Sequence, residues 1–348
     1  MVPVVDLSRR GARFAERFAA TATRIVGGGT YLLGDELESF EAEFADWLGA
    51  EHVVAVSSGA AALQLALTAA GVGPGQEVLV PAFTAVPTAS AVIAAGARPV
   101  AVDVDPGTAC ITPDAIAAAR TPHTTAVIVV HLYGFAAPLP DTDLTIVQDA
   151  AQAHGALSDH STSAALAYSF YPTKNLGGIG DGGAVVTPDP ALAETVRRLR
   201  VHGMAHQYVH ESISQNFRMS ELEAAWLRLA LSELDDDVAA RRRIAKTYRE
   251  AAPRLRWQAD HPSHANHLCV FRSDRRDEVR DDLARAGVST AVHYPLALTQ
   301  QPGYRAIFPT ACPQAEAWAA ECISVPCFPE MTAAEIDVVT AALAQVPV

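Results

Sequence analysis

The chain has few of the features that would commit it to a membrane, a nucleic acid or an export route. No run of residues approaches the ~20 consecutive apolar residues of a membrane-spanning helix, and residues 1–18 lack the apolar core of a signal peptide. The 26 basic against 39 acidic residues leave a formal charge of -13, which argues against a basic face for nucleic acids or anionic membranes. We therefore expect a cytoplasmic protein whose partners include neither.

Cysteine is also sparse, and no two cysteines show the CxxC spacing of a metal or redox motif. We interpret them as small core residues in a reducing environment: Cys110, Cys269, Cys312, Cys322 and Cys327. The 12 histidines do not pair at ligand spacing beside a cysteine or carboxylate in a recognisable motif, so we predict no metal. What remains, 348 residues of which 50% are hydrophobic, is enough for a large α/β domain and a smaller one.

Helical and strand patterns alternate along the first half of the chain. Residues 36–49 place Leu37, Phe40 and Phe44 on one helical face and end at a glycine, which predicts an amphipathic helix. From residue 52 to residue 149, short β-branched runs are separated by Ala-rich helical segments and Gly/Pro turns. Strands this apolar and this regularly separated predict an α/β fold with a mostly parallel sheet covered on both faces.

The second half of the chain predicts long helices and then a smaller unit. The stretch 219–252 reads as one helix, long enough to bridge two domains, and residues 267–348 alternate strand and helix patterns. We expect a large domain over residues 1–235, with an N-terminal arm, and a small C-terminal α/β domain over residues 236–348.

The stretch "SFYPTKNLGGIGDGGAVVT", residues 169–187, carries two competing signals. Gly178, Gly180 and Gly183 have the spacing of a dinucleotide-binding loop, but that loop must open a helix whose N-terminus binds the pyrophosphate. Here the strand-like "AVVT" follows. We therefore interpret the glycines as a turn between two strands that allows close backbone approach, and Lys174 needs its own explanation.

A lysine can act as a covalent catalyst when its amine condenses with a carbonyl, as in pyridoxal phosphate (PLP) sites. Such a site also needs a carboxylate for the pyridine nitrogen and a cup for the phosphate. Asp149 ends the apolar segment "LTIVQD", and the carboxyl edge of an open α/β sheet is where ligands bind. The Ser-Gly turn of "SSGAAALQLAL" opens a helix, whose first amides can bind an anion.

Several segments together resemble one known family. "SSGAAALQLAL", "VVHLYGF", "QDAAQAHGA", "SFYPTKNLGGIGDGGAVVT", "QNFRMSELEAA" and "VHYPLALTQQPGY" resemble the DegT/StrS-type sugar aminotransferases over residues 25–345. The resemblance implies the three-layer α/β/α PLP-transferase fold type I. It also implies that Lys174 forms a Schiff base with PLP and moves a proton at the substrate carbon, and that Asp149 keeps the ring nitrogen protonated.

The resemblance assigns further residues to the cofactor. Ser169 and the amides of Gly59 and Ala60 match phosphate ligands, and Gln152 matches a glutamine beside the cofactor, unless it only caps a helix. Asn216 matches an asparagine that reaches the phosphate of the neighbouring subunit, so that a homodimer shares its sites; the alternative is a cap on a helix beginning near Met219.

Other positions in the motifs are assigned to the substrate or left open. His154 lies in "QDAAQAHGA" and is either catalytic or, as is commoner, packed at a turn. His210, His293 and Tyr294 are candidates for the substrate pocket.

The chain also departs from the family pattern in several places. Ala60 removes a phosphate-binding hydroxyl, and Ala85 replaces a stacking aromatic ring for which Phe83 could compensate. Residues 157–167 contain no Lys or Arg where a basic loop is usual, and Thr299 replaces a common histidine. These departures concern the nucleotide part of the substrate more than the transfer of the amino group.

We therefore expect a PLP-dependent aminotransferase, with pyridoxamine phosphate formed between its half-reactions, in amino-sugar or antibiotic biosynthesis. The expected donor is glutamate or glutamine, and the expected acceptor is a nucleotide-linked keto-sugar. A keto-cyclitol is the alternative acceptor, which the missing basic loop favours. A sugar dehydratase of the same family lacks the lysine, so Lys174 argues against it, and a PLP-fold regulator without activity remains the non-enzymatic alternative.

Overall fold

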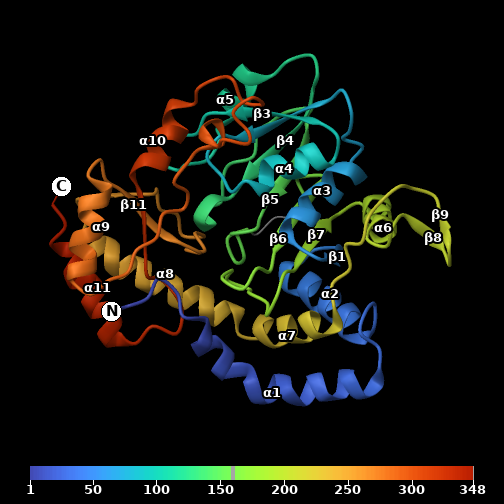
Figure 1. Cartoon of the computed structure of the whole chain (residues 1–348), viewed down its shortest axis with the longest axis horizontal. Helices are drawn as coiled ribbons and strands as arrows, with labels where there is room; N and C mark the ends of the chain where they lie inside the picture. The colour runs from blue at the N-terminus through green and yellow to red at the C-terminus, as the bar shows by residue number, and fades with distance from the viewer. Residues whose placement is uncertain (158–160, 348) are drawn as a thin grey trace.

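A seven-stranded sheet forms the centre of the computed structural model, which describes residues 1–157 and 161–347 (Figure 1). The strand order is β1-β7-β6-β5-β4-β2-β3. All neighbours pair in parallel except β7, which runs antiparallel to both β1 and β6. The mostly parallel α/β sheet that we predicted is therefore confirmed. The strands are β1 (His52–Val56), β2 (Glu77–Pro81), β3 (Arg98–Val102), β4 (Thr124–Val130), β5 (Thr145–Asp149), β6 (Ala165–Ser169) and β7 (Gly183–Thr187).

Helices cover both faces of this sheet because alternate strand residues belong to different apolar cores. In β1, Val54 and Val56 join the core under α3, α4, α5 and α6, whereas Val53 and Ala55 join the core under α1, α2 and α7. The result is the three-layer α/β/α arrangement. These helices are α1 (Leu7–Gly28), α2 (Asp35–Leu48), α3 (Gly59–Ala69), α4 (Pro87–Ala94), α5 (Pro113–Ala119), α6 (Pro190–Leu199) and α7 (Glu221–Leu231).

The long helix that we predicted over residues 219–252 is wrong in one respect, because it is broken into α7 and α8 (Leu234–Ala251) at Ser232 and Glu233. The Ser232 hydroxyl donates to the carbonyl oxygen of Leu229 at 2.7 Å, a local bond that competes with continued helix. Three aspartates then occupy the first turn of α8, where the positive end of a new helix dipole favours them. The two helices still run one after the other from the sheet to the C-terminal part (Figure 1).

The C-terminal part packs its own apolar core around a three-stranded antiparallel sheet, in the order β10-β11-β12. The proposed division after residue 235 falls in the first turn of α8, and it stays a prediction. The elements of this part are β10 (Arg256–Trp257), β11 (Cys269–Arg272), α9 (Arg276–Arg285), a 3-10 turn (Leu298–Gln300), α10 (Pro313–Glu321), β12 (Cys322–Val325) and α11 (Ala333–Ala344). Another 3-10 turn, Leu132–Gly134, follows β4 in the large sheet.

The remaining sequence predictions can be checked against these elements. The amphipathic helix is confirmed as α2, whose Leu37, Phe40 and Phe44 are buried and whose end is capped by Gly49 in the left-handed region. All five cysteines are free and buried, as expected of small core residues. In the part of the chain that the structure describes, no helix is both long and apolar enough to cross a membrane.

Candidate active site

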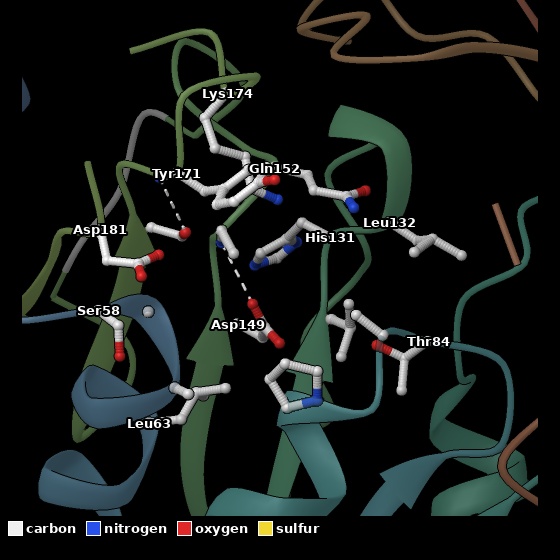
Figure 2. Close-up of a pocket in the computed structure, with 17 residues that line it drawn as sticks. Ser58, Leu63, Thr84, His131, Leu132, Asp149, Gln152, Tyr171, Lys174 and Asp181 are labelled. Atoms are coloured by element: carbon white, nitrogen blue, oxygen red, sulfur yellow. Dashed lines mark hydrogen bonds between the residues drawn. The ribbon is translucent and has the colours of Figure 1, made fainter. Parts of the chain in front are cut away.

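A cavity of about 260 Å³ opens at the carboxyl ends of β4, β5 and β6 and at the N-terminus of α3. This is the edge at which parallel sheets bind ligands. Figure 2 shows Asp149 between the Lys174 loop and the Ser58 turn, and Ser169 ends the neighbouring strand β6. The residues that we assigned from distant motifs, namely Gly59, Ala60, Asp149, Gln152, Ser169 and Lys174, all line this one cavity.

Lys174 lies on the loop between β6 and β7 and reaches the cavity from above its carboxyl edge (Figure 2). Its backbone N–H donates to the carbonyl oxygen of Tyr171 at 2.8 Å. The side chain is partly exposed to the cavity, but the protein surrounds its amine, and this burial lowers the pKa of Lys174 to about 8, against the opposing effect of the Asp149 carboxylate. A lysine with such a pKa is neutral, and hence nucleophilic, in a sizeable fraction of molecules near neutral pH.

The glycines of this loop serve close packing, as we predicted, and not a dinucleotide. A Cβ atom on Gly178 would lie 1.5 Å from Oε1 of Glu223, and one on Gly177 would lie 2.3 Å from the carbonyl oxygen of Pro172. Gly183 begins strand β7, so no helix starts on the glycines. The loop can therefore pass tightly over α7 while it presents Lys174 to the cavity.

Asp149 ends β5 with a buried carboxylate that is only partly satisfied by the protein. Its oxygens accept hydrogen bonds from the Thr88 hydroxyl at 2.9 Å and from the Ala151 N–H at 3.2 Å, the latter drawn in Figure 2. Burial raises the pKa of Asp149, while these two bonds and the nearby Lys174 amine oppose that rise. A buried carboxylate with remaining acceptor capacity suits a cationic N–H group in the cavity.

The opposite end of the cavity is built to hold an anion. Ser58 caps α3 by accepting the Ala61 N–H at 3.1 Å, and the first N–H groups of a helix, here those of Gly59 and Ala60, have no partner within it. A Cβ atom on Gly59 would lie 2.6 Å from Cβ of Ser169. Only glycine therefore lets the helix N-terminus and the Ser169 hydroxyl approach the same point.

Gln152 lies at the rim of the cavity and is held by two contacts. Its Oε1 accepts the Tyr133 N–H, and its Nε2 donates to the Tyr294 hydroxyl at 3.2 Å. Residues 151 and 152 form a turn after β5, so the alternative that Gln152 caps a helix is wrong. His293 and Tyr294 line a second cavity, which shares Gln152 and Lys174 with the first.

Three assigned residues line neither cavity of their own chain. Phe83 is fully buried among Tyr133, Tyr294 and Trp318, where the core, and not a ligand, surrounds its ring. His210 lies on an exposed hairpin of two short strands, β8 (Met204–His206) and β9 (Val209–His210). The third is Asn216.

Asn216 is exposed, and its Oδ1 accepts the Arg218 side-chain Nε–H at 2.9 Å. The alternative that Asn216 caps the following helix is wrong, because Ser220 caps α7 by accepting the Glu223 N–H.

His154 proves to be a packed residue. Its ring lies among Phe44, Tyr168 and Phe170, and neither ring nitrogen has a hydrogen-bond partner within the described residues. Burial lowers the pKa of His154 to about 3, so the ring is neutral. Of the loop 157–167, whose lack of basic residues we noted, residues 158–160 lie outside the described part of the chain.

The sequence interpretation missed several residues that shape the cavity. Thr88, Tyr171 and Asp181 were not singled out, nor was His131, whose burial lowers its pKa to about 4 and whose Nε2 lies 2.8 Å from Oε1 of Gln148. Thr88 lies 61 residues from Asp149 in the chain, so no local pattern joins them. His131 directly follows β4, and that position at the carboxyl edge is the signal that could have identified it.

The residues that line the first cavity fit the phosphate, the ring nitrogen and the aldehyde of PLP. The cavity offers amides and a hydroxyl for the phosphate, a buried carboxylate for the ring nitrogen and a lysine amine for the aldehyde. Within residues 1–157 and 161–347, no group of three or more His, Cys, Asp or Glu side chains could hold a metal ion.

Known proteins resemble the chain over almost its whole length. The sequence pattern of the DegT/DnrJ/EryC1/StrS aminotransferase family matches residues 13–344. The erythromycin biosynthesis sensory transduction protein EryC1 of Saccharopolyspora erythraea is 41% identical, over 98% of this chain and 98% of its own. The dTDP-3-amino-3,4,6-trideoxy-alpha-D-glucose transaminase of Streptomyces venezuelae is 40% identical, over 95% and 92%.

Solved structures agree with these matches. The crystal structure of S. venezuelae DesV in complex with a ketimine intermediate has a TM-score of 0.94 and 39% identity, and the superposition covers 99% of this chain and 98% of that one. NtdA from Bacillus subtilis, solved with bound cofactor PMP, has a TM-score of 0.89 and 28% identity, over 95% and 81%.

Proposed function

This chain belongs to the DegT/DnrJ/EryC1/StrS aminotransferase family, and from that premise we propose that it transfers an amino group from glutamate or glutamine to the keto group of a nucleotide-linked sugar. It is a PLP-dependent transaminase. The observation that carries the proposal is the meeting of Lys174 and Asp149 in one cavity at the end of the sheet. The S. venezuelae relative, named as a transaminase of a dTDP-linked amino sugar, supports the choice of acceptor.

We assign the roles of the side chains from their positions. PLP supplies an aldehyde that carries the amino group and a ring that accepts an electron pair. The amides of Gly59 and Ala60 and the Ser169 hydroxyl would bind its phosphate, and Asp149 would hold the proton of the ring nitrogen. The Lys174 amine would hold the cofactor through its aldehyde and would move a proton at the substrate carbon, a task that suits a pKa of about 8.

A panel of acceptors tests the substrate class. The purified enzyme would be given glutamate or glutamine with nucleotide-linked keto-sugars, free keto-sugars and keto-cyclitols, and product amines would be measured by mass spectrometry. We expect turnover with a nucleotide-linked keto-sugar. Turnover restricted to keto-cyclitols would overturn this choice in favour of the second candidate, which the absence of Lys and Arg from residues 157–167 supports.

A regulatory role is the other candidate, because the EryC1 relative is named a sensory transduction protein. Lys174 and Asp149 support catalysis in this chain, since a binding protein needs neither a reactive amine nor an electron sink. Conversion of the bound cofactor to its aminated form by an amino acid, followed in its absorbance spectrum, separates the two. A spectrum unchanged by every donor would favour the regulator.

We also propose that two subunits share each active site, with Asn216 of the partner subunit serving the phosphate held by Ser169. Asn216 is exposed and does not line the cavity of its own chain. The nearby hairpin exposes Tyr208, Val209 and Ile213, apolar side chains that a second subunit would cover.

Mixed dimers of Lys174→Ala and Asn216→Ala chains test the shared site. Shared sites predict that mixing two inactive parents restores activity toward half that of the wild-type dimer, because one site then carries both defects and the other neither. If mixing the two inactive parents restores nothing, each chain uses its own Asn216, because every site then carries one defect.

A further inference from the structure

A second cavity of about 360 Å³ shares Lys174 with the cofactor cavity. It is enclosed by the N-terminal segment around Val4, by α8 and by three loops of the C-terminal part. Lys174, Gln152 and Tyr171 line both cavities. The second cavity therefore opens onto the same amine at which the amino group is exchanged.

Arg241, on α8, contributes a buried cation to this cavity. Only 2% of the residue is exposed. Its Nη1 donates to the carbonyl oxygens of His267, at 3.3 Å, and Cys327. Its Nε has no hydrogen-bond partner within the described residues, and no hydrogen bond from its Nη2 is found there either. A guanidinium carries five N–H donors and stays protonated, so most of its bonding capacity is unused.

Among the described residues, no carboxylate lies within ion-pair distance of this guanidinium. The acidic residues near it, Asp237 and Glu330, each lie 3.0 Å from Nη1 of Arg13 and are therefore already paired. Within the described residues, Arg241 forms no ion pair. A buried charge without a partner is costly, and an anion that enters the cavity would remove that cost.

The rest of the lining favours an anion as well. No acidic side chain in the described part of the chain lines the second cavity, whereas Asp149 and Asp181 line the first. Burial holds the pKa of His267 well below its ordinary value and lowers that of His293, so both rings are neutral donors or acceptors. Lys174, Arg241 and His267 line the same cavity, and both cations help to lower the pKa of His267.

We infer that the second cavity binds a carboxylate of the amino-acid donor, with Arg241 as its counter-ion. The inference rests on the proposed function. An amino acid that delivers its nitrogen where Lys174 reaches carries a carboxylate two bonds from that nitrogen, so the carboxylate must lie beside Lys174. The second cavity is the space next to Lys174 that offers an unpaired buried cation.

A purely structural role for Arg241 is the rival explanation, and its neighbour provides a matched control. Arg242 also ties α8 to backbone carbonyls, those of Gly155, Ser263 and His264, at 2.7, 3.0 and 3.1 Å. It lines neither cavity. The Arg242→Gln variant thus removes comparable bonds between α8 and the same region without touching the cavity.

The first experiment compares Arg241→Gln, Arg241→Lys and Arg242→Gln holoenzymes in the two half-reactions. We expect Arg241→Gln to raise the KM for the amino-acid donor by about tenfold to a hundredfold and to leave the acceptor half-reaction within about twofold. Arg241→Lys should recover part of the loss because it keeps the charge. Arg242→Gln should change neither half-reaction. Equal effects of both glutamine variants, or an effect on the acceptor alone, would overturn the inference.

A donor panel identifies the carboxylate. If Arg241 binds the α-carboxylate, the KM values for glutamate, glutamine and alanine rise together in Arg241→Gln. If it binds the side-chain carboxylate, only the KM for glutamate rises. Either result supports the site, and unchanged KM values for all three donors would exclude it.

The second experiment needs no variant and no acceptor, so it stands if the acceptor proposal fails. Glutarate, an unreactive dicarboxylate, is titrated into wild-type holoenzyme by calorimetry, with the uncharged glutaramide as control. We expect glutarate to bind and to compete with the amino-acid donor, and glutaramide to do neither. Glutarate that fails to bind, or that competes only with the acceptor, contradicts the assignment.

Discussion

The two cavities that share Lys174 differ in the acidic groups that surround their buried cations. The Lys174 amine of the cofactor cavity interacts with the Asp149 carboxylate, whereas no acidic residue in the described part of the chain pairs with Arg241 of the second cavity. In the first cavity, burial lowers the pKa of Lys174 and the Asp149 carboxylate opposes that lowering, so the two effects together set the fraction of neutral amine. The second leaves a charge uncompensated, and this is the electrostatic condition for binding a substrate anion.

The largest expected effect comes from removing the reactive cation alone. Lys174→Ala should abolish transamination, a loss of at least about a thousandfold, and should abolish the borohydride-stable link between protein and cofactor that mass spectrometry detects. Glutarate binding should persist, because Arg241 is intact. A variant with full turnover would show that the amine is not the group that reacts.

Asp149→Asn should have the next largest effect, because it keeps the shape of the side chain and removes the charge. We expect PLP still to bind while the single-turnover rate of donor deamination falls about a hundredfold, or about 2.7 kcal/mol of barrier. A stopped-flow absorbance measurement reports that rate. A loss below about tenfold would mean that another group holds the proton of the ring nitrogen. A large change in the KM for the amino-acid donor would mean that Asp149 also acts on the second cavity, which contradicts the proposed separation of the two cavities.

Gly59→Ala tests the anion end of the cofactor cavity. The added Cβ would meet Cβ of Ser169 at 2.6 Å, so we expect about 1–3 kcal/mol of lost stability and about tenfold weaker PLP binding, measured by thermal unfolding and by titration of the cofactor-free enzyme. The control is Gly11→Ala in α1, where nothing lies within 4 Å and about 0.5–1 kcal/mol of stabilisation is expected. If both variants changed stability and PLP binding equally, the close approach of Gly59 to Ser169 would be contradicted.

The smallest expected effect is a shift in pH dependence. In cofactor-free enzyme, the rate at which PLP attaches to Lys174 should rise through a midpoint near pH 8, because burial lowers the pKa of Lys174 to about 8 and the neutral amine is the nucleophile. Asp149 opposes that lowering, so the midpoint in Asp149→Asn should fall below that of the wild type. A midpoint that rises, or does not move, would mean that the two groups do not interact across the cavity.

Much of the fold follows from local patterns in the sequence. The apolar β-branched runs predicted the strands from β1 to β5, and the periodic face of residues 36–49 predicted α2, because burial on one or two faces imposes the spacing of apolar residues. Helix α1 was not identified from its sequence, and the break at Ser232 was missed. A hydroxyl that bonds to its own backbone leaves no trace in the apolar pattern.

The candidate site was also predictable from the sequence only in part. Lys174, Asp149 and the Gly59 turn were predictable, since each lies in a short motif at the end of a strand or the start of a helix, where chain direction alone brings ligand-binding groups to one edge. Phe83 shows the limit of this reasoning, because the position after a strand does not determine which neighbour its ring will meet.

The sequence by itself determined the alternation of strands and helices from β1 to β5, the candidate lysine and the carboxylate that ends β5, because these depend on residues close together in the chain. Only the tertiary structure decided that Thr88 donates to Asp149, that Ser220 and not Asn216 caps α7, and that Arg241 reaches a cavity beside Lys174 where no acidic residue of the described chain pairs with it. The physical reason is that hydrogen bonds and buried charges act over a few ångströms in space, whatever the separation along the chain.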